Sequence, residues 1–506
     1  MRLSRLIFTG TAAMLVAVLG TTTASAAPTA GAPGIGDPYY PFDGNGGYDV
    51  VHYDIRLNYT PAMDLISGTT TILAKATQDL AQFDLDFLLK VKSVRVNNAA
   101  AGFRSTSDGE LVVTPTKVLP RGTDLTIVVS YSDVPSNPDY KLYGFNSYTR
   151  TPTGALAVNE PQIAPWWYPS NDHPTDKATF DVSIAAPEGY EVLSNGVLVD
   201  RQQQPNGFVR WSWRSIQPQN TYATFFVVGQ FDDLRFQTAP NGKPFVSAYG
   251  NELGASADAA RASVERTPEI LEFEATQFGD YPFEAEGGIV VNPGELGFAL
   301  ENQTRPVYDG RSFRRGSNTY VVAHENAHQW FGDSTSVHGW TDIWLNEGFA
   351  TYAEYLWSEY LGEGTPAEVA QFTYESIPAD DEFWQVLPSD PGPNEQFNDA
   401  VYDRGGMTLQ ALRTAIGDDA FFQVLRTWSA THRYGNGSTP QFIALAEQIS
   451  GRQLSDLFST WLYTKGKPAT GPNDAVGARP ASLRPAAEPK SFAKIKETRE
   501  SLVGGR

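Results

Sequence analysis

The chain of 506 residues contains no cysteine, and this absence removes several kinds of chemistry at once. Without cysteine there is no disulfide, no thiolate metal ligand, no cysteine nucleophile and no lipidated N-terminal cysteine. Any metal must therefore be held by nitrogen and oxygen ligands. The fold must be stabilised by buried apolar surface and by bound metal.

Basic residues are also in short supply. Lysine and arginine together number 38 against 58 aspartate and glutamate residues, so the formal net charge is −20. Nucleic acids and anionic membrane surfaces bind proteins that present a basic face. We therefore expect no nucleic acid partner. Solubility outside the cell is a sufficient explanation of the acidity.

Long apolar runs are absent except near the N-terminus. Arg2 and Arg5 precede an apolar run over residues 6–20, and Ala24-Ser25-Ala26 follows it. This pattern predicts a signal peptide over residues 1–26 and hence a secreted, extracellular protein. The alternative is an uncleaved membrane anchor, which the short run and the good cleavage site disfavour. No later stretch reaches the roughly 18 apolar residues of a membrane span, so no membrane partner is expected after signal removal.

Histidine occurs only six times, and two copies frame the segment His-Glu-Asn-Ala-His over residues 324–328. On a helix of about 3.6 residues per turn, His324 and His328 lie on one face, and Glu325 flanks a bound metal without binding it. Zinc in a hydrolase takes three protein ligands and leaves one position for water, and Glu347 fits the third place. The pattern predicts one Zn²⁺ per chain. The alternative, a surface helix with two solvated histidines, leaves the spacing of Glu347 unexplained.

The local sequence favours two helices for these ligands. Ser317 or Asn318 can cap a helix over residues 320–331, and Gly332 stands where that helix should end. A second helix is expected to begin near Thr341 or Asp342 and to end near residue 362. This placement puts the third ligand in the first turns of the second helix.

Other candidate ligands are less clear. Glu354 lies two turns beyond Glu347 on the same helix face. It either accepts a hydrogen bond from a ligand histidine or forms a surface salt bridge. The remaining histidines have no spacing typical of a metal site, so core or surface positions are expected for His52, His173, His338 and His432.

The pattern of apolar residues divides the chain into parts and indicates a multidomain α+β protein. Residues 48–240 show mostly period-two alternation, which predicts an N-terminal antiparallel β-sandwich. Helical spacing dominates residues 241–467, and the turn-forming residues around Asn241 suggest the boundary. Residues 27–47 are expected to form an N-terminal linker. Residues 468–506 have few apolar anchors, which predicts a disordered tail.

The neighbours of the zinc residues point to a known family. Residues 328–333 read His-Gln-Trp-Phe-Gly-Asp, and residues 340–350 read Trp-Thr-Asp-Ile-Trp-Leu-Asn-Glu-Gly-Phe-Ala. These segments resemble the gluzincin aminopeptidases of the aminopeptidase N and leukotriene A4 hydrolase family, and are most similar to short secreted bacterial members. The resemblance extends from about Tyr48 to Lys467. It implies a β-sandwich followed by a thermolysin-like zinc metallopeptidase domain.

The resemblance also assigns roles outside the zinc segment. Residues 298–302 are similar to the family's Gly-Ala-Met-Glu-Asn strand, which implies that Glu301 binds the substrate's α-amine and Asn302 its backbone. Tyr402 matches the tyrosine that steadies the transition state. Glu160 sits where the family's β-domain supplies a second acid to the amine.

The sequence departs from the family pattern in two respects. Phe298 replaces a glycine and Leu300 a methionine, which changes the shape of the pocket for the first side chain. The chain also stops soon after Lys467, where many members continue into a large helical capping domain. A more open cleft is expected as a result.

Together these features predict a secreted zinc aminopeptidase that acts on peptides with a free N-terminus. Bound zinc lowers the pKa of its water to about 7, and Glu325 is the expected general base. One alternative is an endopeptidase or oligopeptidase with the same zinc chemistry. A second is a non-catalytic surface protein that contains zinc, and epoxide hydrolysis is a more distant third.

Overall fold

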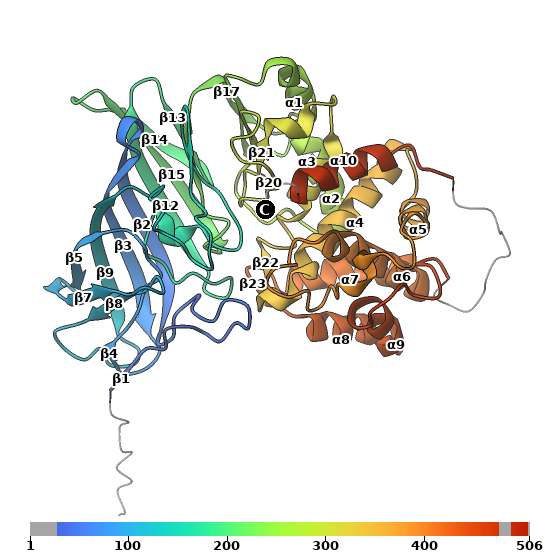
Figure 1. Ribbon diagram of the computed structural model, residues 1–506, viewed down its shortest axis with the longest axis horizontal. Helices are drawn as coiled ribbons and strands as arrows, with labels where there is room; N and C mark the ends of the chain where they lie inside the picture. Colours follow the sequence, from blue (N-terminus) through green and yellow to red (C-terminus); the bar gives the residue numbers. More distant parts are fainter. Residues whose placement is uncertain (1–27, 475–486, 504–506) are drawn as a thin grey trace, which may run out of the picture.

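The computed structural model describes residues 28–474 and 487–503. Figure 1 shows two domains side by side, a strand-rich N-terminal domain on the left and a largely helical domain on the right. The predicted signal peptide, residues 1–26, lies outside the described residues. None of the described helices combines the length and the apolar character that crossing a bilayer requires.

The N-terminal domain is built on an eight-stranded sheet whose strands alternate buried and exposed side chains. In β2, Tyr53, Ile55 and Leu57 are buried, whereas Asp54 and Arg56 are exposed. All neighbouring strands are antiparallel except β2 and β12, which run parallel. The spatial order is β14 (Val197–Gln203), β15 (Phe208–Gln219), β12 (Ala178–Pro187), β2 (Tyr48–Thr60), β3 (Leu65–Ala76), β9 (Asp124–Asp133), β5 (Val91–Val96) and β6 (Ala99–Ala100).

A second, four-stranded sheet and two short strand pairs complete this domain. The sheet has the order β10 (Thr149–Thr151), β11 (Gly154–Ala157), β16 (Phe226–Gly229) and β13 (Glu191–Ser194). The pairs are β1 (Thr29–Ala30) with β4 (Leu80–Gln82) and β7 (Gly102–Ser105) with β8 (Leu111–Thr114). One apolar cluster joins side chains from both sheets. The predicted β-sandwich is therefore confirmed.

The C-terminal domain begins with a five-stranded sheet, and its first strand corrects the predicted boundary. The order is β17 (Phe231–Thr238), β18 (Pro244–Gly250), β19 (Glu286–Val291), β21 (Val307–Asp309) and β20 (Ala299–Leu300). The boundary predicted at Asn241 is wrong, because that residue lies in the turn of the β17–β18 hairpin, where the Ala239 N–H donates to the Lys243 carbonyl at 2.8 Å. The domains meet instead between Gly229 and Phe231. Turn-forming residues mark a hairpin as readily as a domain boundary.

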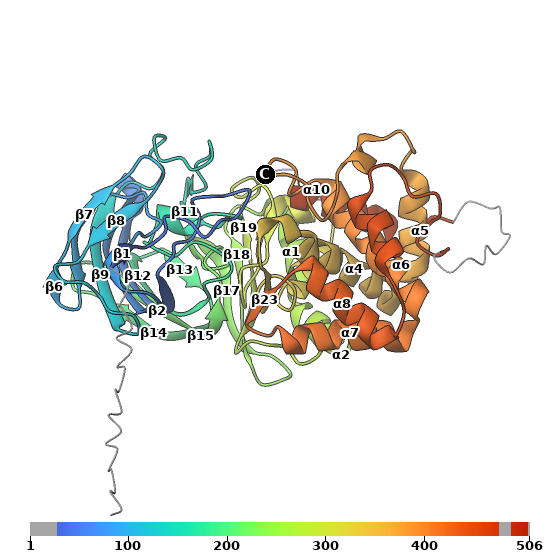
Figure 2. The ribbon, with the colours of Figure 1, turned by 90° about the horizontal axis from the view of Figure 1, so that it is seen from below.

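Helices cover one face of this sheet, and the β-sandwich covers the other (Figure 2). Val290 of β19 belongs to the helical core cluster, whereas its neighbours Ile289 and Val291 belong to the β-sandwich cluster. The α-helices are α1 (Ala257–Val264), α2 (Thr267–Phe278), α3 (Thr319–Ala327), α4 (Trp344–Leu361), α5 (Pro366–Ser376), α6 (Gly405–Ile416), α7 (Asp418–Thr431), α8 (Thr439–Ser450), α9 (Ser455–Phe458) and α10 (Phe492–Val503).

Short elements connect the longer ones. The described residues include two π-helices, η7 (Ala400–Arg404) and η8 (Ser459–Tyr463). The strands β22 (Thr335–Val337) and β23 (Gly435–Gly437) form a parallel pair. The 3₁₀ helices are η1 (Pro61–Met63), η2 (Ala164–Trp166), η3 (Gly254–Ser256), η4 (Gly310–Phe313), η5 (Trp340–Asp342) and η6 (Glu382–Gln385).

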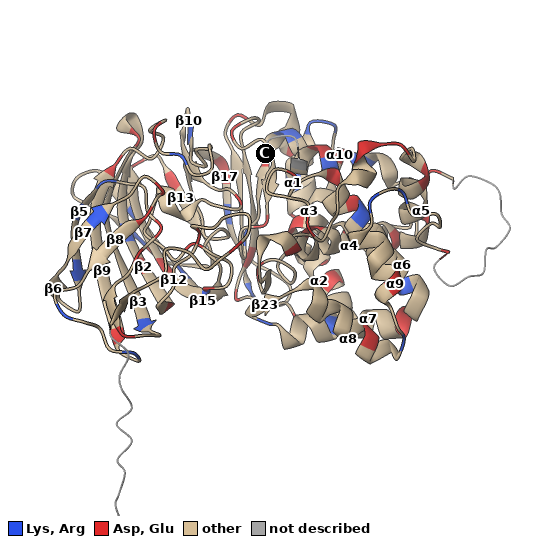
Figure 3. Cartoon of the chain, turned by 60° about the horizontal axis from the view of Figure 1, so that its bottom comes forward, with Lys and Arg blue, Asp and Glu red and all other residues tan. Residues whose placement is uncertain are grey.

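The acidic excess of the sequence is distributed over both domains. Figure 3 shows aspartate and glutamate positions in the β-sandwich and on the helices, with lysine and arginine positions among them. Nothing in the fold tests the expectation that nucleic acid is not a partner, and it stays a prediction.

The segment predicted as a linker packs against both domains over its described residues, 28–47. Tyr39 donates a hydrogen bond from its hydroxyl to Asp390 at 2.5 Å. Asp37 accepts one from the backbone N–H of Trp340 at 2.9 Å and lies 3.4 Å from His173. The linker prediction is wrong because these polar and aromatic side chains bind partners far away in the sequence, of which Trp340 and His173 are buried.

The tail predicted as disordered contains an ordered helix. α10 packs against α3, with Ile495 and Leu502 buried, and the ring of Phe492 contacts that of Phe372 at a centroid distance of 4.6 Å. Residues 475–486 lie outside the described residues. The prediction is wrong for residues 487–503, because a few apolar side chains suffice when the rest of the domain offers a surface for them.

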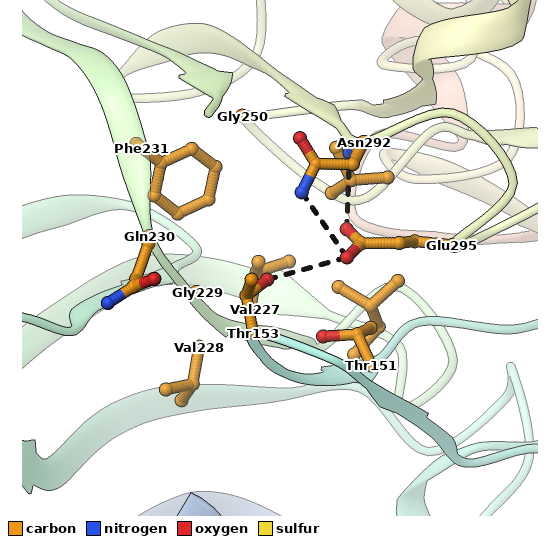
Figure 4. A pocket seen from close by; sticks show the side chains of 12 residues that line it. Thr151, Thr153, Val227, Val228, Gly229, Gln230, Phe231, Gly250, Asn292 and Glu295 are labelled. Carbon is orange, nitrogen blue, oxygen red and sulfur yellow. Dashed lines mark hydrogen bonds between the residues drawn. The ribbon is translucent and has the colours of Figure 1, made fainter. Parts of the chain in front are cut away.

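The seam between the domains contains a small hollow (Figure 4). Thr153 of the β-sandwich domain donates a hydrogen bond to Glu295 of the C-terminal domain at 3.4 Å, and Glu295 also accepts one from the Asn292 backbone at 3.1 Å. None of the predicted metal, catalytic or substrate-binding residues is among the described residues that line this hollow. The predicted site lies elsewhere along the seam.

Candidate metal centre and active site

The two histidines of the predicted metal site lie at the end of α3. Its N-terminus is capped as predicted, since the Asn318 side chain accepts a hydrogen bond from the Tyr320 N–H at 3.1 Å. The predicted end at residue 331 is wrong, because the helix ends at Ala327 and wider turns follow, such as the bond from the Asp333 N–H to the His328 carbonyl at 3.0 Å. His328 keeps helical backbone angles, so it still lies one turn below His324.

Glu347 reaches these histidines from the first turn of α4, as predicted. Its Oε2 lies 3.2 Å from His324 Nε2 and 3.4 Å from His328 Nε2. All three side chains are at most 2 % exposed. Two neighbouring helices thus bring three side chains of the kinds that bind zinc, two histidines and one glutamate, to one point.

The hydrogen bonds of the Nδ1 atoms of His324 and His328 indicate that the three residues fit Zn²⁺. His324 Nδ1 lies 2.7 Å from Glu354 Oε1, and His328 Nδ1 lies 3.0 Å from the Phe331 carbonyl oxygen. Both partners are acceptors, so each Nδ1 carries the proton and each Nε2 presents a lone pair. Two lone pairs and a carboxylate oxygen then lie within 4.8 Å of one another, which a divalent cation satisfies.

Glu354 takes the first of its two predicted roles. Its side chain is fully buried and accepts the hydrogen bond from His324 just described. Burial raises the pKa of this carboxyl, and the hydrogen bond from His324 and the charge of Arg499 oppose that rise. The alternative of a surface salt bridge is wrong.

Two further carboxylates stand beside the metal ligands. Glu301 directly follows β20, and Glu325 lies on α3. One ligand atom each of Glu301, Glu325 and His328 lies within 4.8 Å of the others. Glu301 accepts a hydrogen bond from the Tyr222 hydroxyl at 3.0 Å, and Gln329 binds its backbone carbonyl at 2.9 Å. The predicted base and the predicted amine acceptor therefore meet at the metal site.

Tyr402 lies in the π-helix η7, an irregularity that recurs at functional sites. Its ring stacks on that of His324 with a centroid distance of 5.9 Å. Gly348 of α4 and Gly405, the first residue of α6 directly after η7, allow these two helices to approach closely, because a Cβ on Gly348 would lie 2.9 Å from the Gly405 Cα. The structure thus brings Tyr402 to the metal ligands.

Glu160 reaches the same region from the β-sandwich, in the loop after β11, and is 4 % exposed. Burial and then the charges of Glu301 and Glu160 raise the pKa of the Tyr222 hydroxyl well above its usual value. Both carboxylates therefore lie near this hydroxyl. Asn302 is buried as well, and its Nδ2 donates to the Ala223 carbonyl of the β-sandwich domain at 3.3 Å.

The more open cleft stays a prediction, although the side chains of the site are well buried. Each predicted metal, catalytic or substrate-binding side chain is at most 4 % exposed. Three aromatic rings contact one another beside the site: Trp340 makes edge contacts with Tyr40 at 6.2 Å and with Tyr222 at 5.6 Å between centroids. Trp340 belongs to the family-like segment, but no sequence signal marks the two tyrosines, which lie in distant segments.

Comparison with known proteins agrees with this arrangement. Residues 50–223 match the Peptidase M1 N-terminal domain, and residues 264–461 match the Peptidase family M1 domain. The chain belongs to peptidase family M1. Membership confirms the predicted family and the two-domain fold, and it agrees with zinc as the metal of the site.

Solved structures similar to this M1 peptidase include the M1 zinc metallopeptidase from Deinococcus radiodurans. It is 28% identical, with a TM-score of 0.76, and the match covers 88% of the present chain and 100% of that chain. A mutant of that metallopeptidase bound to a Tyr-Ser-Ala substrate matches with a TM-score of 0.75. The fold and the positions of both domains are thus shared with an M1 peptidase of similar length.

Longer relatives are similar over most of this M1 peptidase. Aminopeptidase M1 from Arabidopsis thaliana is 27% identical over 456 residues, which cover 82% of the present chain and 50% of the relative. Glutamyl aminopeptidase from Rattus norvegicus is 24% identical over 459 residues, with coverages of 83% and 47%. The chain spans about half the length of the aminopeptidases it matches.

Proposed function

We propose that this M1 peptidase is a secreted zinc aminopeptidase that removes N-terminal residues from peptides with a free α-amine. The observation that carries the proposal is the approach of Glu301 to Glu325 and His328 within 4.8 Å. A carboxylate fixed there can bind a substrate ammonium about one residue away from the carbonyl that is attacked. Cleavage in the middle of a peptide requires no such acid.

His324, His328 and Glu347 would hold the zinc ion. When bound, zinc lowers the pKa of water to about 7 and polarises the substrate carbonyl. The Glu325 carboxylate accepts a proton from the attacking water and delivers it to the leaving amine nitrogen, a role worth about 10² to 10⁴ in rate. The Tyr402 hydroxyl donates a hydrogen bond to the carbonyl oxygen as that oxygen gains negative charge.

Glu301 and Glu160 would hold the substrate's ammonium from opposite domains. Their burial strengthens the attraction, because water screens it poorly there. The Tyr222 hydroxyl keeps Glu301 in place through its 3.0 Å hydrogen bond. Asn302 Oδ1, which has no hydrogen-bond partner among the described residues, is available to the substrate backbone. The Tyr-Ser-Ala complex of the relative from Deinococcus radiodurans supports a peptide substrate.

Secretion rests on the charged, apolar and small-residue pattern of residues 1–26. If the proposal is right, the mature protein accumulates in the culture medium and its N-terminus is Ala27. N-terminal sequencing of the exported protein tests this. An intact Met1 on cell-bound protein would contradict it.

The aminopeptidase proposal is tested with a panel of aminoacyl amides and short peptides, each with and without an N-acetyl group. We expect rapid hydrolysis of the substrates with a free amine and little hydrolysis of the acetylated ones. A zinc chelator should abolish the hydrolysis of both substrate classes. Equal rates on free and acetylated peptides would favour an endopeptidase or oligopeptidase. A zinc-loaded protein that hydrolyses none of them would be the non-catalytic alternative.

A further inference from the structure

The C-terminal helix α10 places a buried arginine directly behind the metal site. Arg499 is 6 % exposed, and its Nη2 donates hydrogen bonds to Thr351 on α4 and to Asp403 on η7, both at 3.0 Å. Figure 1 shows α10 lying next to α3, far along the chain from the other site residues. The helix therefore connects three elements that carry the site.

The guanidinium group completes a closed ring of contacts around the ligand His324. Its central carbon lies 4.3 Å from the centroid of the Tyr402 ring, whose centroid is 5.9 Å from that of His324. Arg499 Nη2 also lies 3.6 Å from Glu354 Oε1, the oxygen that accepts the hydrogen bond from His324 at 2.7 Å. Arg499 thus contacts both side chains that flank this ligand.

Several bonds fix the position of α10 on the catalytic domain. Asn318, which caps the zinc helix α3, donates from its Nδ2 to the Thr498 hydroxyl at 3.0 Å. Ser491 lies 2.8 Å from Ser358 at the end of α4, measured between the hydroxyl oxygens. Because the helix is tied to both ligand-bearing helices, the arginine one residue after Thr498 has a defined place.

These contacts allow Arg499 to orient the Tyr402 and Glu354 side chains, and they give it no direct part in the reaction. A guanidinium group over an aromatic face is attracted by the ring, and the attraction is stronger where water is excluded. The charge of Arg499 is offset by Asp403 and Glu354, as a buried charge requires. Residues that hold metal ligands and their neighbours in place typically change metal affinity or activity by about 10- to 100-fold when removed.

We propose that Arg499 is a positioning residue, which holds the Tyr402 ring and the Glu354 carboxylate so that the C-terminal helix completes the active site. The inference rests on the proposed aminopeptidase function and on the role given there to Tyr402. The Tyr402 hydroxyl donates its hydrogen bond only if its ring is correctly aimed, and the Arg499 guanidinium packs on a face of that ring.

The test is a double-mutant cycle in the full-length, zinc-loaded protein, with Arg499→Ala, Tyr402→Phe and the double variant. For Arg499→Ala we expect kcat to fall about 10- to 100-fold with KM within about twofold and one zinc per chain retained. Tyr402→Phe alone should lower kcat about 10²- to 10³-fold. In the Tyr402→Phe background, Arg499→Ala should lower kcat by a smaller factor than in the wild type, because the part of its effect that acts through the Tyr402 hydroxyl is already lost and only the part through Glu354 remains.

Two further variants guard against a trivial result. Arg315→Ala removes an exposed salt bridge of 2.8 Å between Arg315 and Glu500, which lies on α10 like Arg499. This control variant should leave kcat unchanged. Arg499→Lys keeps the charge but loses the planar fork, so its kcat should lie between those of the wild type and Arg499→Ala. If Arg499→Ala does not fold, as measured by thermal unfolding, the cycle is run with Arg499→Lys.

The outcomes separate this inference from the proposed function. A wild-type kcat for Arg499→Ala, or an equal loss in both backgrounds, overturns the positioning role alone. An unchanged kcat for Tyr402→Phe overturns the role of Tyr402 and the inference that rests on it. The same holds if the wild-type protein hydrolyses no substrate.

Discussion

The metal-binding half of the site and its amine-binding half are assembled differently. His324, His328 and Glu347 come from two successive helices of one domain, α3 and α4. Glu160 and Glu301 come from different domains, and the charges of both act on the Tyr222 hydroxyl. Under the proposed function, the reaction depends on local helix geometry, whereas recognition of the substrate's end depends on how the two domains fit. Substitutions in the two halves should therefore have different effects, on kcat in the metal-binding half and on substrate preference in the amine-binding half.

The largest effect is expected in the metal half. Glu325→Gln removes the proton acceptor and should lower kcat by about 10² to 10⁴ while one zinc per chain is retained. Steady-state kinetics together with metal analysis check this. Glu359→Gln, at an exposed position of α4, is the matched control and should leave both quantities unchanged. Wild-type turnover by the Glu325 variant would remove it from the mechanism.

Substitutions in the amine-binding half should lower the preference for free-amine substrates and leave the catalytic step intact. Glu301→Gln weakens a charge-assisted contact to the ammonium, which corresponds to a fall in kcat/KM of about 10- to 100-fold on free-amine substrates. Rates on N-acetylated substrates should stay the same, so the ratio between the two substrate classes measures the effect. Glu160→Gln should act in the same direction from the other domain. If neither variant lowers the ratio of kcat/KM on free-amine substrates to that on N-acetylated substrates, Glu301 and Glu160 do not bind the substrate's ammonium.

A smaller effect on activity is expected from a substitution in the helix packing that supports the metal-binding half. Gly348→Ala places a methyl group 2.9 Å from the Gly405 Cα, so α4 and the start of α6, which continues η7, must move apart. Such overpacking costs about 1–3 kcal/mol of unfolding free energy. Denaturant unfolding measures it, and kcat should fall as well because Tyr402 moves with η7. Full stability and full activity together would show that the close approach of the two helices is not needed.

The smallest effect is expected at the seam away from the site. Thr153→Ala removes a single, long hydrogen bond to Glu295, seen in Figure 4, and should change the unfolding free energy by only about 0.5 kcal/mol. The preference for free amines over acetylated ones should not change. A change in that preference would mean that the whole seam, and not only the neighbourhood of Glu160, sets recognition.

The features that sequence reasoning predicted correctly are local ones. The cap at Asn318, the one-turn spacing of the histidines and the alternation along β2 are each determined within a few residues. Glu347 was predictable because it lies on the next helix of the chain. Tyr402, Glu301 and Glu160 required resemblance to a family, since nothing nearby distinguishes them from the other tyrosines and carboxylates of the chain.

The features that sequence reasoning missed depend on partners far away in the chain. The turn at Asn241 has the same chemistry in a hairpin as in a linker, so only the pairing of β17 with β18 decides its meaning. α10 has few apolar residues, and its helix is stabilised by contacts with α3 and α4. Tyr40 and Arg499 become part of the site only when the termini of the chain fold back onto it.

The packing of β20 limits how this protein can be divided. Phe298, which precedes β20, and Leu300, the last residue of β20, belong to the apolar cluster of the β-sandwich and not to that of the helices. A fragment containing residues 231–503 alone would present these side chains, with Ile289 and Val291, to water. We expect such a fragment to aggregate on expression, and crystallographic or engineering work should keep both domains in one polypeptide.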